Sequence, residues 1–167
     1  MTAKAVLIGP PGSGKSTLGR MLAERLGVEF RDTDADVEAV AGKPVSDIFV
    51  EDGEERFREL EHEAVRLALA EHEGVLSLGG GAVLHTETQA LLAGHHVVYL
   101  QVGLSAAIER VGLASARPLL VLSPRSQLKK LMEERRPVYE RLAVITVVTD
   151  KREPEELADE IVKGLPA

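Results

Sequence analysis

The amino-acid sequence predicts an α/β fold in which helices cover both faces of a parallel β-sheet. Short strand-like segments alternate with helical segments along the chain, a pattern typical of β–α–β units with right-handed crossovers. The first strand-like segment, residues 4–8, leads directly into a glycine-rich motif. The length of 167 residues suits one compact domain. We therefore expect a single domain, residues 1–167, whose ligand lies at the carboxyl ends of the strands.

Five short segments are the predicted strands of this sheet. They are residues 4–8, 28–31, 75–78, 97–102 and 144–148.

Segments with apolar residues at helical spacing are predicted to connect these strands. They are residues 16–26, 36–41, a short start at 46–49, 54–72, 86–93, 105–111, 124–135, 137–139 and 154–164. Gly27 is expected to end the first helix and Ser105 to cap a later one. Pro124 and Pro154 each suit the first turn of a helix. The stretch 112–123 fits no regular element.

The long helix over residues 54–72 has two different predicted faces. Its apolar line consists of Phe57, Leu60, Ala64, Leu67 and Ala68. On a separate face, Glu54, Arg58 and Glu61 follow one another at i, i+4 and i+7.

The segment Gly9–Ser16 matches the phosphate-binding pattern G-x-x-x-x-G-K-[ST] at every fixed position. Glycines let the backbone N–H groups turn inward around an anion, and the following helix adds its positive amino end. Lys15 can reach the outer phosphates of a nucleotide, and the Ser16 hydroxyl can bind Mg²⁺. A glycine-rich turn with a surface lysine is the alternative, but the strand before the motif and the helix after it favour nucleotide binding.

Two further segments follow strands and should reach the same edge of the sheet. Asp32 and Asp34 stand two residues apart at a strand end, so both can point the same way. One acid can serve the Mg²⁺ shell and the other can face an acceptor hydroxyl, although one of them could simply cap the next helix. Gly79-Gly80-Gly81 removes side chains where a ligand must approach the backbone.

Four arginines are candidates for binding a carboxylate or phosphate, because a guanidinium binds such groups bidentately. They are Arg58, Arg117, Arg135 and Arg136. Each alone could be a solvated surface charge, and sequence spacing does not show that they converge.

Composition excludes several classes of function. The net charge of −7 disfavours a nucleic-acid surface, and the absence of cysteine excludes disulfides and thiolate zinc sites. No apolar run approaches the 18 residues of a membrane span, so we expect no membrane partner and a cytoplasmic location. The five histidines suggest no metal set and are expected to be structural or at the surface. Tyr99 is expected in the core.

Taken together, these segments resemble the shikimate kinase family over nearly the whole chain. The resemblance rests on the P-loop, on Asp32-Thr33-Asp34, on the segment 47–61 with its F-R-x-x-E sequence, on Gly79–Val83, on Arg117-Pro118-Leu119-Leu120 and on Arg135-x-Pro137-x-Tyr139. It implies an ATP:shikimate 3-phosphotransferase of aromatic amino acid biosynthesis. It also implies a three-layer P-loop kinase fold, a five-stranded sheet in the order 2-3-1-4-5, Mg²⁺ as cofactor and a monomer.

The resemblance also implies roles for individual residues. The acceptor region spans about residues 33–61 and the mobile lid about 112–123. Shikimate would contact Asp34, the carboxylate clamp Arg58 and Arg135, and the backbone of Gly79, Gly80 and Gly81. Lys15, Asp34 and Arg117 would be catalytic, with Asp34 acting as a general base or substituting for one. Ser16 and Asp32 would serve Mg²⁺, Asp32 through water. ATP would be bound by Gly12, Ser13, Gly14, Lys15, Ser16, Thr17, Arg110, Arg117, Arg152 and Pro154.

The chain departs from the family pattern at two places, and three alternative functions stay open. Either Arg135 or Arg136 could be the clamp, although the spacing to Pro137 favours Arg135, and residues 113–116 of the lid carry no obvious nucleotide contact. The nearest rival is a gluconate kinase on the same fold. The others are a regulatory nucleotide-binding module without catalysis and a nucleic-acid-binding P-loop protein.

Overall fold

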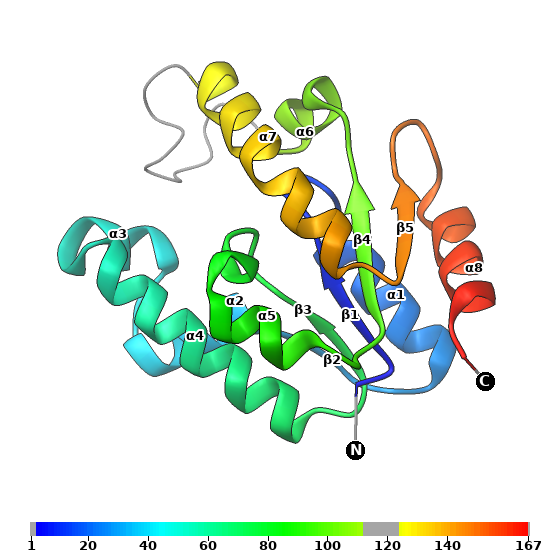
Figure 1. The fold of residues 1–167 in the computed structure, drawn as a ribbon, viewed down its shortest axis with the longest axis horizontal. Coiled ribbons are helices and arrows are strands. Elements are labelled where there is room, and N and C mark those ends of the chain that lie inside the picture. Colours follow the sequence, from blue (N-terminus) through cyan, green and yellow to red (C-terminus); the bar gives the residue numbers. More distant parts are fainter. Residues whose placement is uncertain (1–2, 112–123, 167) are drawn as a thin grey trace.

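Five strands form one parallel sheet in the computed structural model, which describes residues 3–111 and 124–166 (Figure 1). They are β1 (Ala5–Ile8), β2 (Phe30–Asp32), β3 (Val75–Ser77), β4 (Val97–Gln101) and β5 (Ile145–Val148). Their order is β2-β3-β1-β4-β5, which confirms the expected topology. In the centre of the sheet, Val6 of β1 pairs with Leu76 on one side and Val97 on the other.

The helices that join these strands are mostly amphipathic. They are α1 (Lys15–Leu26), α2 (Thr33–Ala41), α3 (Val45–Asp52), α4 (Glu54–Glu71), the short 3₁₀ helix η1 (Ala82–Leu84), α5 (Thr86–Leu92), α6 (Leu104–Val111), α7 (Pro124–Leu142) and α8 (Pro154–Gly164). No helix among the described residues is both long and apolar enough to cross a membrane.

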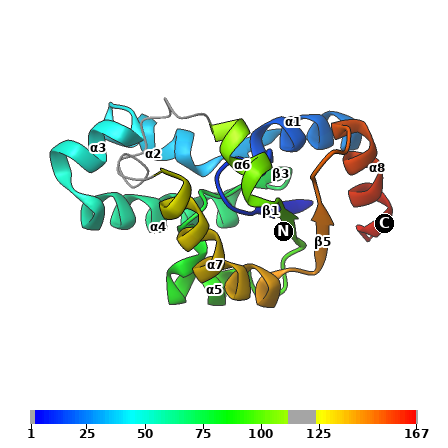
Figure 2. The same cartoon turned by 90° about the horizontal axis from the view of Figure 1, so that it is seen from above.

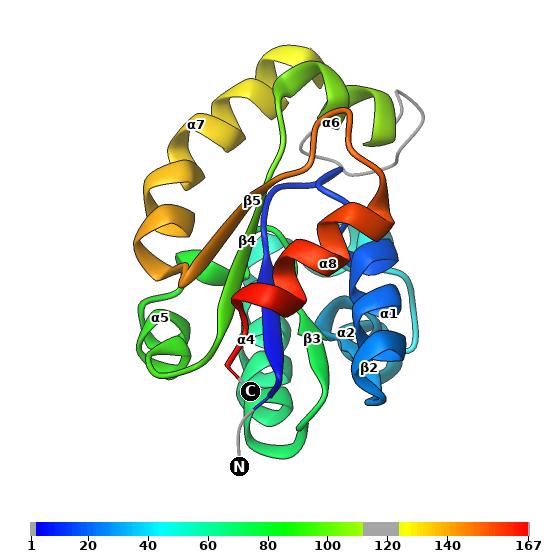
Figure 3. The same ribbon diagram turned by 90° about the vertical axis from the view of Figure 1, so that its right-hand side faces the viewer.

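Helices cover both faces of the sheet and make three layers (Figures 2 and 3). Because side chains alternate along a strand, Val6 and Ile8 of β1 pack under α4, α5 and α7, whereas Ala5 and Leu7 pack against α1 and α8. Tyr99 belongs to the first of these cores, as expected. The α2–α3 pair packs on the outer part of α4, at the opposite end of the molecule from α8 (Figure 1).

Two predicted helix starts were wrong, and for α2 a side-chain carboxylate explains the observed start. Helix α2 begins at Thr33 rather than at residue 36, because the carboxylate of Asp32 accepts the Asp34 N–H at 2.9 Å and caps the helix. Helix α6 begins at Leu104, so Ser105 lies inside it and is not its cap. The Asp150 carboxylate holds the preceding residue by accepting the Gly103 N–H.

Packing overrides two further predictions. Helix α7 continues through Pro137 without a break, and Leu128 and Tyr139 on either side of that proline are both buried. In α4, Leu67 is 37% exposed, while Glu61, expected away from the apolar line, is only 3% exposed. The expected lid over residues 112–123, including Arg117, lies outside the described residues.

Candidate active site

The loop between β1 and α1 has the backbone conformation of an anion cradle. Gly12 and Gly14 have φ angles of +80° and +91°, which glycine adopts without steric cost. Gly14 also precedes the first residue of α1, so the positive amino end of that helix faces the loop. The Lys15 ammonium donates to the carbonyl oxygens of Gly9 and Pro10 at 2.7 and 3.1 Å, which holds it over the loop.

A pocket of about 440 Å³ lies beside this loop at the carboxyl edge of the sheet. Its lining comes from four separate parts of the sequence: residues 11–17, the two acids Asp32 and Asp34, residues 77–80 and Arg110. Of the predicted nucleotide-binding and metal-binding residues, Gly12, Ser13, Gly14, Lys15, Ser16, Thr17, Asp32 and Arg110 line this one pocket. The pocket is large enough for a small ligand, and its walls are mostly polar.

Oxygen donors for a hard cation meet in this pocket. The Ser16 hydroxyl lies 3.3 Å from a carboxylate oxygen of Asp32. Burial raises the pKa of Asp32, and the neighbouring Asp34 carboxylate raises it further. A cation would offset both effects, so a hydroxyl and an incompletely compensated carboxylate fit Mg²⁺.

Asp34 lines the pocket from a helix and not, as predicted, from the end of a strand. It lies in the first turn of α2. Its carboxylate nevertheless faces the triple glycine, because a Cβ placed on Gly79 would lie 2.7 Å from its Oδ1 and 2.9 Å from Oε2 of Glu61. Glycine at this position therefore allows two acids to approach the backbone closely.

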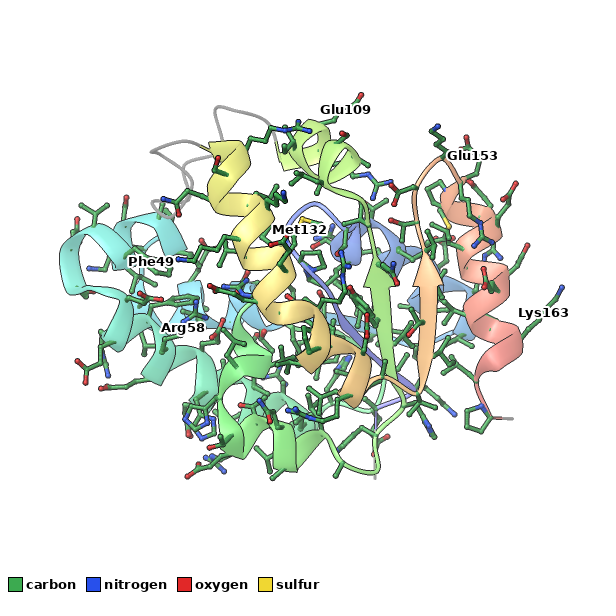
Figure 4. All side chains as sticks on the ribbon, turned by 45° about the horizontal axis from the view of Figure 1, so that its top comes forward. Phe49, Arg58, Glu109, Met132, Glu153 and Lys163 are labelled. Carbon is green, nitrogen blue, oxygen red and sulfur yellow. The ribbon has the colours of Figure 1, made fainter. Side chains whose placement is uncertain are left out.

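Arg58 and Glu61 form an ion pair on α4 next to the triple glycine. Figure 4 labels Arg58. Nη1 of Arg58 donates to Oε1 of Glu61 at 2.7 Å. A Cβ on Gly81 would lie 2.5 Å from the same Nη1, so any larger residue at this position would displace the guanidinium. Burial raises the pKa of Glu61, although the neighbouring Arg58 partly counters this.

Arg135 approaches the triple glycine from α7. Its side chain is buried, and its Nε has no hydrogen-bond partner among the described residues. Nη1 lies 3.2 Å from a Cβ placed on Gly80. Arg136, the alternative clamp, is exposed. An unpaired buried N–H is costly, so the arrangement favours an anionic ligand at Arg135.

The remaining nucleotide-binding candidates divide into two groups. Arg110 donates to the Gly12 carbonyl at 3.1 Å and to the Thr149 hydroxyl at 3.2 Å, which places it across the mouth of the P-loop. Arg152 and Pro154 follow β5 and are not among the residues that line the pocket. Arg152 is paired with Glu160 at 2.6 Å.

Two residues support this site that the sequence analysis named without giving them a role in it. Glu61 was placed on the same helix face as Arg58, and the structure shows that the two residues form an ion pair. Tyr139 donates a hydrogen bond of 2.6 Å to the Gly80 carbonyl. That contact joins residues 59 positions apart, so no local pattern predicts it.

Known proteins resemble this chain in both sequence and structure. The family model described as shikimate kinase matches residues 11–166. A shikimate kinase of Thermobifida fusca is 61% identical over 163 residues, which cover 98% of this chain and 95% of the relative. The solved shikimate kinase from Acinetobacter baumannii in complex with shikimate has a TM-score of 0.91 at 35% identity and covers 95% of this chain and 90% of its own. A gluconokinase from Sinorhizobium meliloti, with a TM-score of 0.58 at 22% identity over 98% of this chain and 91% of its own, shares the fold alone.

Proposed function

The chain belongs to the shikimate kinase family, and we propose that its reaction takes place in the pocket beside the P-loop. The enzyme transfers the γ-phosphoryl group of ATP to the 3-hydroxyl of shikimate, giving shikimate 3-phosphate and ADP. One observation supports this location for the site. The Arg58–Glu61 pair and the buried Arg135 meet the Gly79–Gly81 backbone directly beside the phosphate-binding loop.

The P-loop is proposed to hold the nucleotide. Its backbone N–H groups and the amino end of α1 bind the phosphates, and Lys15 leaves its two carbonyl partners to stabilise the transferring phosphoryl group. Arg110 spans the mouth of the loop and adds positive charge. Arg152 and Pro154 are proposed to flank the adenine.

Ser16 and Asp32 are the proposed Mg²⁺ residues, with Asp32 acting through water. When bound, Mg²⁺ neutralises charge on the phosphates. The short distance between the Ser16 hydroxyl and the Asp32 carboxylate supports this assignment.

The acceptor site is proposed to bind shikimate through its carboxylate. Arg58 and Arg135 supply two guanidinium groups for that carboxylate, and the glycine backbone lines the pocket. Asp34 then faces the ring hydroxyls, where its carboxylate orients the 3-hydroxyl and takes its proton as the new P–O bond forms. Alignment of this hydroxyl with the γ-phosphate supplies much of the rate enhancement in such a reaction.

The remaining assignments extend this proposal to the whole chain. Residues 1–167 are proposed to form one kinase domain, with residues 33–61 as its acceptor region. The lid expected over residues 112–123, with Arg117 as its phosphate-binding residue, lies outside the described residues and stays a prediction. Such a lid would keep water from the γ-phosphoryl group. We propose that the enzyme acts as a monomer, which light scattering coupled to size-exclusion chromatography would test.

A coupled assay of ADP release with Mg²⁺-ATP tests the proposed function. Shikimate, gluconate and no acceptor are compared at equal concentration. Release that requires shikimate is the expected result. Release with gluconate alone would overturn the acceptor assignment, and ATP binding without any acceptor-dependent release would indicate a regulatory nucleotide-binding module.

A further inference from the structure

A cluster of possible metal ligands lies outside the pocket described above, where α4 meets the start of α5. His62 comes from α4, His85 precedes α5, and Glu87 lies in its first turn. One ligand atom from each of the three residues lies within 4.8 Å of the other two. We propose that these residues bind one divalent transition-metal ion of the zinc type.

The ligand set determines the class of ion. Two imidazole nitrogens and one carboxylate oxygen suit Zn²⁺ and its neighbours in the first transition row, whereas Mg²⁺ and Ca²⁺ prefer oxygen ligands alone. Three protein ligands leave a fourth position for water. The proposed ion is therefore chemically distinct from the Mg²⁺ assigned to Ser16 and Asp32.

The surroundings of His62 prepare it for coordination. Its Nδ1 lies 3.2 Å from the hydroxyl of the buried Thr88, and its Nε2 lies 3.0 Å from Oε2 of Glu87. A metal-binding histidine commonly donates its second ring N–H to an oxygen, which fixes the ring and directs the other nitrogen to the ion. With Nδ1 directed to Thr88, Nε2 already faces the carboxylate that would share the ion.

His85 must turn to complete the site. Its ring is stacked on that of His62, with centroids 4.0 Å apart and planes within 8° of parallel, so the in-plane lone pairs of the two rings do not converge on one ion in this arrangement. His85 is exposed and lies outside the helices. Its ring is therefore able to rotate at the cost of one hydrogen bond, from the Glu87 N–H to Nδ1.

The location connects the proposed ion to the acceptor region. His62 and His85 line a pocket of about 230 Å³ together with Arg58, Glu61 and Gly81. An ion held by His62, His85 and Glu87 would join α4, which carries the Arg58–Glu61 pair, to the segment that follows the triple glycine. Binding should therefore raise the thermal stability of the protein, because the ion binds only where the three residues are brought together by folding.

Calorimetric titration of the nucleotide-free protein with Zn²⁺ tests the proposal. The wild type should bind one ion, and His85→Ala and Glu87→Gln should each weaken binding at least as much as loss of an outer-shell partner does, about tenfold or more. Both changes are at exposed positions, so the variants should fold. His96→Ala is the matched control, since it removes a histidine outside the cluster.

Thermal unfolding of the same four proteins gives a second readout. Zn²⁺ should raise the midpoint of the wild type and of His96→Ala but not that of His85→Ala. Equal affinity and an equal stability shift in all four proteins would overturn the proposal. So would a loss of binding in His96→Ala as large as that in the cluster variants.

Discussion

Tyr139 donates a hydrogen bond of 2.6 Å from its hydroxyl to the backbone carbonyl oxygen of Gly80, and both groups are buried. Burial raises the pKa of Tyr139 to about 12. The hydroxyl therefore stays protonated, and able to donate, throughout the pH range of an ordinary kinase assay. The contact ties α7, which also carries Arg135, to the glycine segment at the acceptor site.

Replacing Tyr139 with phenylalanine should weaken shikimate binding more than ATP binding. The change leaves a buried carbonyl without this donor, which typically costs about 1–3 kcal/mol of stability. It also frees the Gly80–Gly81 backbone to shift relative to Arg135. We expect a several-fold rise in KM for shikimate, and a lower free energy of unfolding in urea.

Tyr99→Phe is the matched control for this change. Tyr99 stacks on Tyr139 with ring centroids 5.0 Å apart, and it is also buried. It should alter stability without a selective effect on shikimate. If both variants raise the two KM values equally, the hydrogen bond to Gly80 has no special role in the acceptor site.

Asp34→Asn should leave ATP binding nearly intact and reduce kcat by about 100-fold or more, the range typical of a lost general base. The change keeps the size of the side chain but removes its charge and its ability to take a proton. Turnover and the ATP dissociation constant are measured separately. Asp36→Asn, two residues further along α2 and paired with Arg31, is the control. Unchanged turnover in Asp34→Asn would remove that residue from the mechanism.

Arg58→Lys should weaken shikimate binding about tenfold or more while changing ATP binding little. Lysine keeps the positive charge, but it offers no planar fork for a carboxylate and cannot reproduce the pair with Glu61. Titration calorimetry with each ligand measures the two affinities. Arg56→Lys, an exposed arginine on the same helix, should bind both ligands as the wild type does. Equal losses of both affinities in Arg58→Lys would contradict a role as substrate clamp.

Gly81→Ala should impair shikimate binding through steric contact with Arg58. The backbone of Gly81 has a φ of −97°, which alanine adopts without strain. Its new Cβ, however, would lie 2.5–2.9 Å from three atoms of the Arg58 guanidinium. The KM for shikimate should rise in Gly81→Ala but not rise further when Gly81→Ala is added to Arg58→Ala. Additive effects in this double-mutant cycle would show that the two residues act independently.

Sequence patterns predicted the parts of this molecule that depend on local chemistry. The P-loop, the strand segments and the glycine run are each set by neighbouring residues, so their types and approximate bounds were visible. Contacts between elements that are far apart in the sequence were harder to predict. The burial of Glu61, the continuity of α7 through Pro137 and the contact between Tyr139 and Gly80 all depend on partners from distant elements. The proximity of His62 and His85 belongs to the same class, since their positions in the sequence suggest no shared site.

The buried Glu61 should make the stability of the protein depend on pH. Desolvation raises its pKa in the folded protein above the ordinary value of 4.5. Between pH 4.5 and that raised pKa, the folded state therefore binds more protons than the unfolded state. Stability then falls as pH rises through that interval, because the slope of the unfolding free energy follows the difference in bound protons. Below the ordinary value Glu61 contributes no slope.

Comparison with Glu61→Gln isolates this contribution, since Asp32, whose pKa is also raised, is present in both proteins. The free energy of unfolding is measured in urea over a pH range that extends both below and above the ordinary value of 4.5. The wild type should lose stability relative to Glu61→Gln as pH increases. Glu63→Gln gives a control of opposite sign, because pairing with Arg66 lowers the pKa of the exposed Glu63 and its contribution is lost as pH falls. A wild-type stability that rises with pH relative to Glu61→Gln would mean that Arg58 outweighs the cost of burying the carboxylate.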